Sequence, residues 1–250
     1  MRKILFSVFA MLFFITIPVS GKSYGWGFTR NGNHSTPDIG KYASEIEGTS
    51  SYYIGNKEEK VIYLTFDAGY DNGNLGPILD ALKAKNVKST FFLTGDFLER
   101  EQELLKRIKE EGHLVGNHTW GHKDITKISH EQLKDQLKKF DEKYYEIFNE
   151  YPKKLFRPPA GQFNHEALIR VKDLGYNTIF WSVAFKDWLD DKRGPEYAYD
   201  NVINNLHNGA IVLLHTVSSD NAAAISMIID KIVEEGYEIK NLDYLVDGNH

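Results

Sequence analysis

Cysteine is absent from the 250-residue sequence. The protein therefore forms no disulfide and offers no thiolate nucleophile or thiolate ligand, so any metal must be held by His, Asp, Glu or water. The chain also lacks an excess of basic residues, because 30 Lys and Arg stand against 35 Asp and Glu, a formal net charge of −5. A nucleic-acid-binding protein presents a concentrated basic face, so we expect no nucleic acid as a partner.

Long apolar runs are also missing, except at the amino terminus. Arg2 and Lys3 precede an almost wholly apolar stretch, residues 4–19, and small residues follow it. This stretch is shorter than the roughly 20 residues that a membrane-spanning helix needs. The pattern is typical of a secretory signal peptide over residues 1–21, which predicts a protein of the cell wall or the space outside the cytoplasmic membrane. An uncleaved anchor is the alternative.

The remaining chain divides into an irregular part and a regular part. Residues 22–59 show no sustained period and are rich in Gly, Ser, Asn and Tyr, which predicts an irregular wrap around the domain. The expected strands of the regular part are Val61–Phe66, Ser89–Thr94, Leu114–Asn117, Lys154–Arg157, Asn177–Val183, Ala210–His215 and Tyr237–Leu242. The expected helices are Leu75–Ala84, Glu101–Glu111, His130–Phe148, His165–Leu174, Tyr197–Leu206 and Asn221–Glu235. Strands that alternate with helices indicate one α/β catalytic domain over residues 60–245, with parallel strands in a barrel-like arrangement.

Polar side chains follow several of these strands. In α/β sheets and barrels, the carboxyl ends of parallel strands are where ligands bind and chemistry occurs. We therefore expect the loops after the strands to converge on one hydrolytic site. The side chains concerned are Asp67, His118, His122, Arg157, Asp187 and His215.

His118 and His122 are four residues apart. On a helix or a helical turn, this spacing places both imidazoles on one face, which suits a first-row metal such as Zn²⁺. The pattern alone is weak, because most such pairs are surface or packing histidines. Its position after an apolar strand and Asn117 favours metal binding.

Asp67 and Arg157 allow two interpretations each. Asp67 is either a turn cap or a general base that takes a proton from water. Arg157 is either part of a structural ion pair or a two-pronged grip that keeps Asp67 ionised. The prolines after Arg157 fix the backbone, which leaves the N–H of Ala160 available to face an oxyanion.

Asp187 lies in a segment that holds two tryptophans, Trp181 and Trp188. Their rings either stack on sugars and wall off an acyl pocket, or they pack in the core. His215 ends an apolar strand, where a lone histidine is usually structural. A carboxylate such as Asp187 close to this imidazole would raise its pKa and keep it protonated as a general acid.

Five motifs in this order resemble those of the polysaccharide deacetylases (carbohydrate esterase family 4, the NodB-homology domain). They are Thr65-Phe66-Asp67-Ala68-Gly69, His118-x-x-x-His122, Arg157-Pro158-Pro159, Asp187-Trp188 and Leu213-Leu214-His215. The resemblance covers about residues 60–245. It implies a distorted (β/α) barrel of about seven parallel strands, of the NodB-homology type, with a divalent metal at the carboxyl-end face.

The resemblance also implies roles for the residues. Asp67 is the expected base, Arg157 positions it, and His118 and His122 are the expected metal ligands. The expected acid is His215.

Further roles follow from the same resemblance. Asp187 tunes the acid, and Leu213 and Trp188 line a slot for the acetyl methyl group. Independently of the resemblance, the residue patterns described above lead us to expect that Ala160 and Trp181 contact the substrate.

A narrower group resembles this chain in Trp26–Phe28, in Tyr53–Asn56 and in the stretch from Phe180 to Trp188. That group is the delta-lactam-biosynthetic peptidoglycan N-acetylmuramic acid deacetylases of spore-forming bacteria. It implies hydrolysis of N-acetyl groups on peptidoglycan glycan strands that lack stem peptides. This reaction leads to muramic δ-lactam in the spore cortex and supports germination, with the forespore intermembrane space as a place of action. We expect a monomer without a stable protein partner.

Ala68 departs from the family pattern, which usually has a second Asp at this position as the third protein ligand of the metal. Two imidazoles and water hold a divalent ion, Zn²⁺ or alternatively Mn²⁺ or Mg²⁺, more weakly than a set that includes a carboxylate. We therefore expect a weakly held, exchangeable metal, completed by water or by Asp71.

Two other functions stay open from the sequence. One is deacetylation of N-acetylglucosamine in wall glycan or chitin-like oligomers. The other is a catalytically impaired glycan-binding protein that uses Trp120, Trp181 and Trp188.

Overall fold

The computed structural model describes residues 22–31, 33–189 and 192–248, so the expected signal peptide lies outside the described residues. Within them, the centre of the protein is a sheet of eight strands, all paired in parallel, in the order β10-β3-β4-β5-β6-β8-β2, with β9 also paired to β3. These strands are β2 (Ser51–Tyr52), β3 (Val61–Ala68), β4 (Thr90–Leu93), β5 (Leu114–Asn117), β6 (Leu155–Phe156), β8 (Asn177–Ile179), β9 (Ile211–His215) and β10 (Glu238–Ile239).

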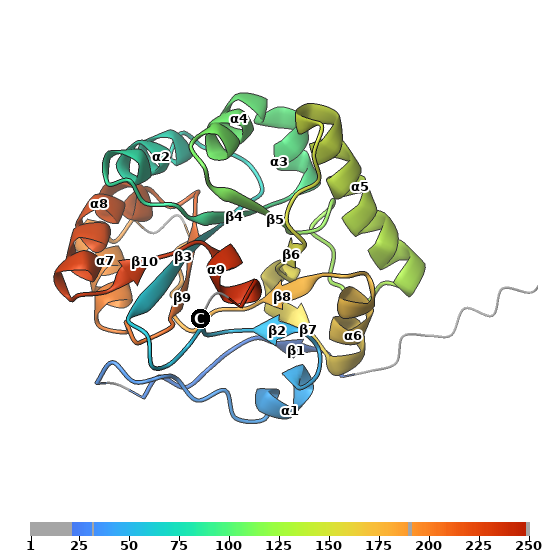
Figure 1. Ribbon diagram of the computed structural model, residues 1–250, viewed down its shortest axis with the longest axis horizontal. Coiled ribbons are helices and arrows are strands. Elements are labelled where there is room, and N and C mark those ends of the chain that lie inside the picture. Colours follow the sequence, from blue (N-terminus) through green and yellow to red (C-terminus); the bar gives the residue numbers. More distant parts are fainter. Residues whose placement is uncertain (1–21, 32, 190–191, 249–250) are drawn as a thin grey trace, which may run out of the picture.

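Helices surround this sheet (Figure 1). They are α1 (Tyr42–Ile46), α2 (Leu75–Ala84), α3 (Gly95–Arg100), α4 (Gln102–Glu110), α5 (His130–Phe148), α6 (His165–Asp173), α7 (Pro195–Ile203), α8 (Ser219–Glu234) and α9 (Leu242–Val246), with a 3₁₀ turn, η1 (Pro159–Gly161). A separate antiparallel pair joins β1 (Tyr24–Gly25) to β7 (Gln162–Phe163). The larger helices lie along the left, top and right of the curled sheet in Figure 1, and the amino-terminal segment with α1 runs along its bottom. The sheet is thus a distorted barrel.

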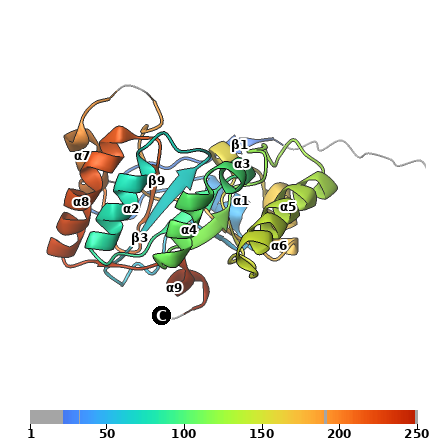
Figure 2. The same cartoon turned by 90° about the horizontal axis from the view of Figure 1, so that it is seen from above.

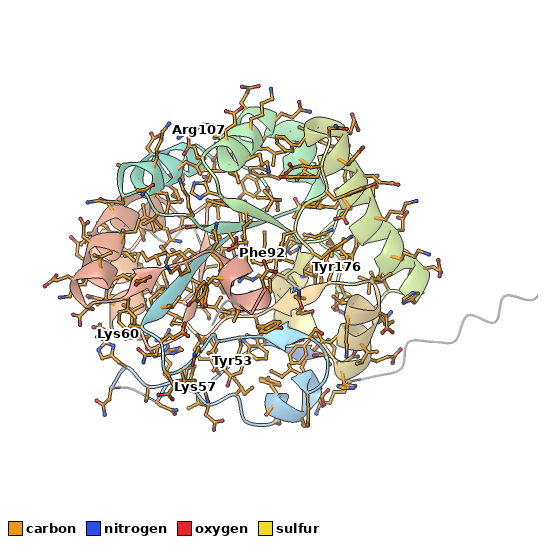
Figure 3. All side chains as sticks on the ribbon, viewed as in Figure 1. Tyr53, Lys57, Lys60, Phe92, Arg107 and Tyr176 are labelled. Carbon is orange, nitrogen blue, oxygen red and sulfur yellow. The ribbon has the colours of Figure 1, made fainter. Side chains whose placement is uncertain are left out.

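β3 is buried along its whole length, as expected of a parallel strand covered on both faces. Its alternate residues Ile62, Leu64 and Phe66 pack outward in the cluster that contains the apolar faces of α2 and α8. The intervening side chains face the inside of the barrel, where Val61 and Tyr63 pack in one cluster with Phe92. Figure 3 labels Phe92 near the centre of the barrel. This two-residue period places Thr65 and Asp67 on the inner face as well, with Asp67 near the carboxyl end.

α9 covers the amino end of the strands. Its residues Leu242 and Leu245 pack against Val61, Tyr63 and Ile211 inside the barrel. In Figure 2, α9 lies below the strands, whereas β1 and α3 lie at the opposite end. The interior is therefore closed at one end and accessible at the end where the strands terminate.

The predicted barrel of about seven parallel strands is confirmed, since every expected strand occurs in the sheet. The strand expected over Asn177–Val183 is shorter, because Phe180 bonds to Tyr52 of β2 while Val183 pairs with Val212 of β9. This change of partner interrupts the ladder and connects the segment after β8 to β9.

The other differences concern short elements. α1, α3 and α9 were not expected, and β2 comes from the segment that was predicted to be irregular. α7 begins at Pro195 and ends at Ile203, earlier than predicted at both ends, because proline suits the first turn of a helix. None of the helices in the described ranges combines the length and the apolarity that a membrane crossing demands.

α5 begins with a capping box. The side chain of Ser129 accepts a hydrogen bond from the N–H of Gln132, and the side chain of Gln132 accepts one from the N–H of Ser129. The two bonds satisfy amide groups that the first helical turn leaves without a partner.

We predict that Ser129→Ala lowers the free energy of unfolding by about 1 kcal/mol, the usual loss for a helix N-cap. Urea unfolding followed by circular dichroism measures this change. Lys134→Ala, an exposed substitution on the same helix, serves as the control and stays within about 0.5 kcal/mol. Equal losses in both variants would contradict the capping role.

Candidate active site

A cleft of about 790 Å³ opens at the carboxyl ends of the strands. Eight of the ten site residues predicted from the sequence line it: Asp67, His118, His122, Ala160, Trp181, Trp188, Leu213 and His215. The other two, Arg157 and Asp187, are buried next to residues that line it. The structure therefore brings together side chains from segments that are up to 148 positions apart, as between Asp67 and His215.

The base of the cleft contains a buried ion pair. The guanidinium of Arg157, fully buried after β6, donates from Nη1 to Oδ1 of Asp67 at 2.8 Å and from Nη2 to Oγ1 of Thr65 at 2.9 Å. Its Nε donates to the carbonyl of Ile179 at 3.1 Å, and its Cζ lies 4.1 Å from the centre of the Phe92 ring. The predicted two-pronged grip on Asp67 is wrong, because the second prong bonds to Thr65.

The environment of Asp67 keeps its carboxylate ionised. Burial alone would raise the pKa of Asp67, but the charge of Arg157, with contributions from His118 and His215, lowers the pKa below its ordinary value. Within the described part of the chain, no turn amide donates a hydrogen bond to this side chain. Asp67 is thus an ionised, oriented carboxylate in the cleft, and the alternative of a turn cap does not apply.

His118 is held in one tautomer. Its Nδ1 lies 2.8 Å from the carbonyl of Arg157, which can only accept, so Nδ1 carries the proton. Nε2 is then an acceptor that faces the cleft, 3.7 Å from Oδ2 of Asp67. Burial lowers the pKa of His118 to about 4, so the imidazole is neutral at physiological pH, as a metal ligand must be.

His122 stands beside His118, with ring centres 4.9 Å apart and the rings edge to face. The expectation that a helix or a helical turn presents both imidazoles is wrong, because residues 118–122 form a loop. Thr119 and His122 have left-handed backbones, with φ of 65° and 52°. Asn117 stabilises this loop by accepting the N–H of Thr119 at 2.9 Å.

These two imidazoles are the metal ligands that the site offers among the described residues. Among the described residues, no group of three or more His, Cys, Asp or Glu is arranged to hold a metal ion. Ala68 is buried and offers no donor. Asp71 does not complete the site, because its two oxygens accept the backbone N–H groups of Gly73 and Leu75. The suggestion that Asp71 supplies a ligand is therefore wrong, and its carboxylate caps α2 instead.

His215 and Asp187 form a second pair on the other side of the cleft. Nδ1 of His215 lies 2.7 Å from Oδ1 of Asp187, and the N–H of His215 donates to Oδ2 at 2.8 Å. Burial alone would lower the pKa of His215, but the bond to Asp187 and its charge, together with the charge of Asp67, raise the pKa above its ordinary value. This geometry agrees with the sequence-based interpretation of a protonated imidazole.

Asn221 is a site residue that the sequence reasoning missed. Its Nδ2 donates to Oδ2 of Asp187 at 2.7 Å and to the carbonyl of His215 at 3.1 Å, and its side chain is fully buried. The local hint was its position at the start of a helix shortly after His215. Nothing in the sequence indicated which carboxylate it would reach.

All four tryptophans of the chain line this one cleft: Trp26, Trp120, Trp181 and Trp188. Trp188 is 53% exposed, and its ring meets that of His215 edge to face at 5.3 Å. Trp120 lies directly over Gly95, where any Cβ would come within 2.2 Å of the indole. Aromatic walls with an exposed face are suited to stacking on sugar rings.

Comparison with known proteins identifies this arrangement. Residues 54–179 match the family model described as polysaccharide deacetylase. The chain is also 44% identical over 230 residues to the peptidoglycan-N-acetylmuramic acid deacetylase PdaA of Bacillus subtilis, an alignment that covers 91% of this chain and 88% of that protein. This chain belongs to the polysaccharide deacetylase family. The resemblance inferred from the five motifs is thus confirmed.

Solved structures of this polysaccharide deacetylase family agree. That of Bacillus subtilis PdaA, a family 4 carbohydrate esterase, has a TM-score of 0.89, 44% identity, and covers 94% of this chain and 100% of its own. In sequence, a peptidoglycan-N-acetylglucosamine deacetylase of Bacillus cereus is 34% identical over 217 residues, which cover 82% of this chain and 97% of that protein. A family 4 pseudoenzyme from Bacillus anthracis is 32% identical with a TM-score of 0.73, and the match covers 78% of this chain and 68% of its own. Membership of the family establishes the fold. The activity and the substrate of this chain have to be argued from the residues of its site.

We predict that Asp187→Asn lowers the pKa of His215, because the substitution removes the charge of Asp187 and replaces its carboxylate acceptor with a weaker, neutral amide oxygen. A histidine NMR titration measures the shift directly. In the wild-type protein the raised pKa contributes stability at pH below the unfolded value of about 6.5, and this contribution is lost as the pH rises through the folded pKa. The variant should show a weaker dependence, because the charge of Asp67 remains. Asp80→Asn, on the exposed side of α2, is the control and leaves the titration of His215 unchanged.

Proposed function

We propose that this protein hydrolyses the N-acetyl group of N-acetylmuramic acid in peptidoglycan strands that lack stem peptides. The observation that supports it most is the opposite shift of two pKa values in one cleft: that of Asp67 is lowered, which favours the carboxylate, and that of His215 is raised, which favours the protonated imidazole. Pairs of titratable groups pushed apart in this way supply a base and an acid at the same pH. The 44% identity to an N-acetylmuramic acid deacetylase over nine tenths of the chain supports the choice of sugar.

The chemistry follows from the positions of the side chains. Asp67 takes a proton from water, whose oxygen forms the new bond to the acetyl carbon. The N–H of Ala160 stabilises the resulting oxyanion. His215 gives its proton to the sugar nitrogen as the carbon–nitrogen bond breaks, so acetate and a free amine leave. Leu213 and Trp188 hold the acetyl methyl group.

His118 and His122 are the residues that would hold a divalent ion, with Zn²⁺ preferred over Mn²⁺ or Mg²⁺ because both ligands are imidazoles. Such an ion, when bound, supplies Lewis acidity for the carbonyl and the water. With Ala68 in place of a carboxylate ligand, we expect the ion to exchange readily.

The product amine lies near the lactyl carboxyl group of the same sugar, so closure with loss of water gives a muramic δ-lactam. We place this reaction in the spore cortex and the protein outside the cytoplasmic membrane, exported by its amino-terminal signal. The related deacetylases that act on peptidoglycan support the location, since that polymer lies outside the membrane.

Acetate release from peptide-free peptidoglycan strands tests the function, with N-acetylglucosamine oligomers in parallel. Release confined to the wall strands is expected. Equal release from the oligomers would favour the N-acetylglucosamine alternative. Glycan binding without release from either substrate, with or without added metal, would favour a catalytically impaired binding protein.

Asp67→Asn should lower kcat about 10²–10⁴-fold, the usual contribution of general base catalysis, while glycan binding persists. Acetate assays and binding to insoluble wall strands measure the two effects separately. Asp80→Asn makes the same chemical change on the surface and should leave kcat within about twofold. Unchanged activity in the Asp67 variant would disprove its role as the base.

Metal binding is predicted to be weak and to depend on His118. Calorimetric titration of the chelator-treated protein with Zn²⁺ should show one site, and His118→Ala should abolish it. A stoichiometric ion that survives dialysis would mean that the protein holds its metal with more than the two imidazoles.

A further inference from the structure

The match to the polysaccharide deacetylase model begins at residue 54, yet one wall of the cleft comes from further upstream. We call residues 22–30 the amino-terminal strap. The strap includes β1, and the pairing of β1 with β7 places Tyr24 opposite Phe163 and Gly25 opposite Gln162. It therefore lies directly beside η1, the turn that contains Ala160.

Trp26 of the strap makes two hydrogen bonds across the cleft wall. Its backbone N–H donates to the carbonyl of Gly161 at 2.8 Å. Its indole Nε1 donates to the carbonyl of Trp181 at 2.9 Å. Only 9% of Trp26 is exposed, so both bonds are shielded from competing water.

The indole of Trp26 also reaches toward the ion pair. It stacks on Phe180 with ring centres 4.1 Å apart and planes 16° from parallel. The carbonyl of Phe180 in turn lies 3.5 Å from Nη2 of Arg157, and Nη1 of the same guanidinium donates to Asp67. Trp26 thus contacts the backbone on both sides of the cleft wall and the segment that supports the base.

The turn that Trp26 contacts needs support. Ala160 has a left-handed backbone, φ 51° and ψ 20°, which residues other than glycine adopt only where surrounding structure imposes it. Gly161 is also left-handed, and a Cβ there would lie 3.1 Å from Cβ of Trp26 and 3.0 Å from the ring of Trp181. The turn is therefore packed tightly between these two tryptophans.

We propose that Trp26 is a positioning residue that fixes the Pro159–Gly161 turn, and with it the N–H of Ala160, where an oxyanion develops. The inference rests on the proposed deacetylase function and extends it to a part of the chain outside the match to the family model. Trp26 acts through the backbone of Gly161 and Trp181. Its loss should therefore slow the chemical step more than it weakens glycan binding.

The test compares Trp26→Phe and Trp26→Ala in the full-length protein. The phenylalanine keeps a ring against Phe180 but loses the Nε1 donor, and the alanine loses both. We expect kcat to fall about 10-fold in the first and about 100-fold in the second, the scale of a catalytic group misplaced by about 1 Å, with KM within about threefold of wild type. A kcat of Trp26→Phe that lies between those of Trp26→Ala and wild type would show that the ring and the hydrogen bond contribute separately.

Hydrogen–deuterium exchange supplies a readout that does not require activity. Amides of residues 160–163 should exchange faster in the order wild type, Trp26→Phe, Trp26→Ala, while those of α8 remain unchanged. Tyr42→Phe is the matched control, since Tyr42 packs on Trp26 in the same aromatic cluster but does not line the cleft. It should leave kcat and exchange within about twofold of wild type.

The outcomes separate this inference from the proposed function. Wild-type kcat in Trp26→Phe, a change confined to KM, or unchanged exchange at residues 160–163 would overturn the positioning role. A wild-type protein that releases no acetate would overturn the deacetylase function and with it the catalytic role of Trp26. If Trp26→Ala does not fold, as judged by circular dichroism, Trp26→Phe alone decides the question.

Discussion

The site depends on the buried pair of Arg157 and Asp67. Removal of a guanidinium from water is unfavourable unless hydrogen bonds and an opposite charge compensate. Here Asp67 supplies the charge, and Thr65 and the carbonyls of Ile179 and Phe180 supply further acceptors. Because these partners come from β3 and the end of β8, the arginine ties opposite sides of the barrel together beneath the cleft. Its own carbonyl accepts the proton of His118, so the same residue also sets the tautomer of the nearest imidazole.

Three titratable groups within this small volume are tuned in different directions. The charges of Asp67 and His215 favour each other's ionised forms, which helps to lower the pKa of the Asp67 carboxyl group and to raise the pKa of the His215 imidazole. His118 lies closer to Asp67 and yet stays neutral, because its burial outweighs the attraction. The difference arises from Asp187, a partner that His215 has and His118 lacks. Local hydrogen bonding therefore decides which histidine can hold a proton.

The sequence predicted the central elements well and the contacts between them less well. β5, α2 and α5 have the predicted limits, because clear periodicity and a capping box mark them. The convergence of the polar residues followed from their places at strand ends. Contacts that depend on distant segments could not be predicted, such as the bonds of Trp26 to residues 161 and 181. The local sequence also could not predict that Arg157 bonds to Asp67 through one nitrogen and to Thr65 through another, or that Asp71 caps α2. Both depend on which groups lie nearby in the folded chain.

α9 at the amino end of the barrel has a consequence for how the protein meets a polymer. The described chain ends just after this helix, at the end of the barrel opposite the cleft (Figure 2). A fusion or surface attachment made there would leave the aromatic rim facing outward. The rim includes Trp188 and Tyr70, both more than half exposed and both able to meet a glycan strand too long to enter any cavity. The fold thus separates a face suited to tethering from a face suited to a solid, extended substrate.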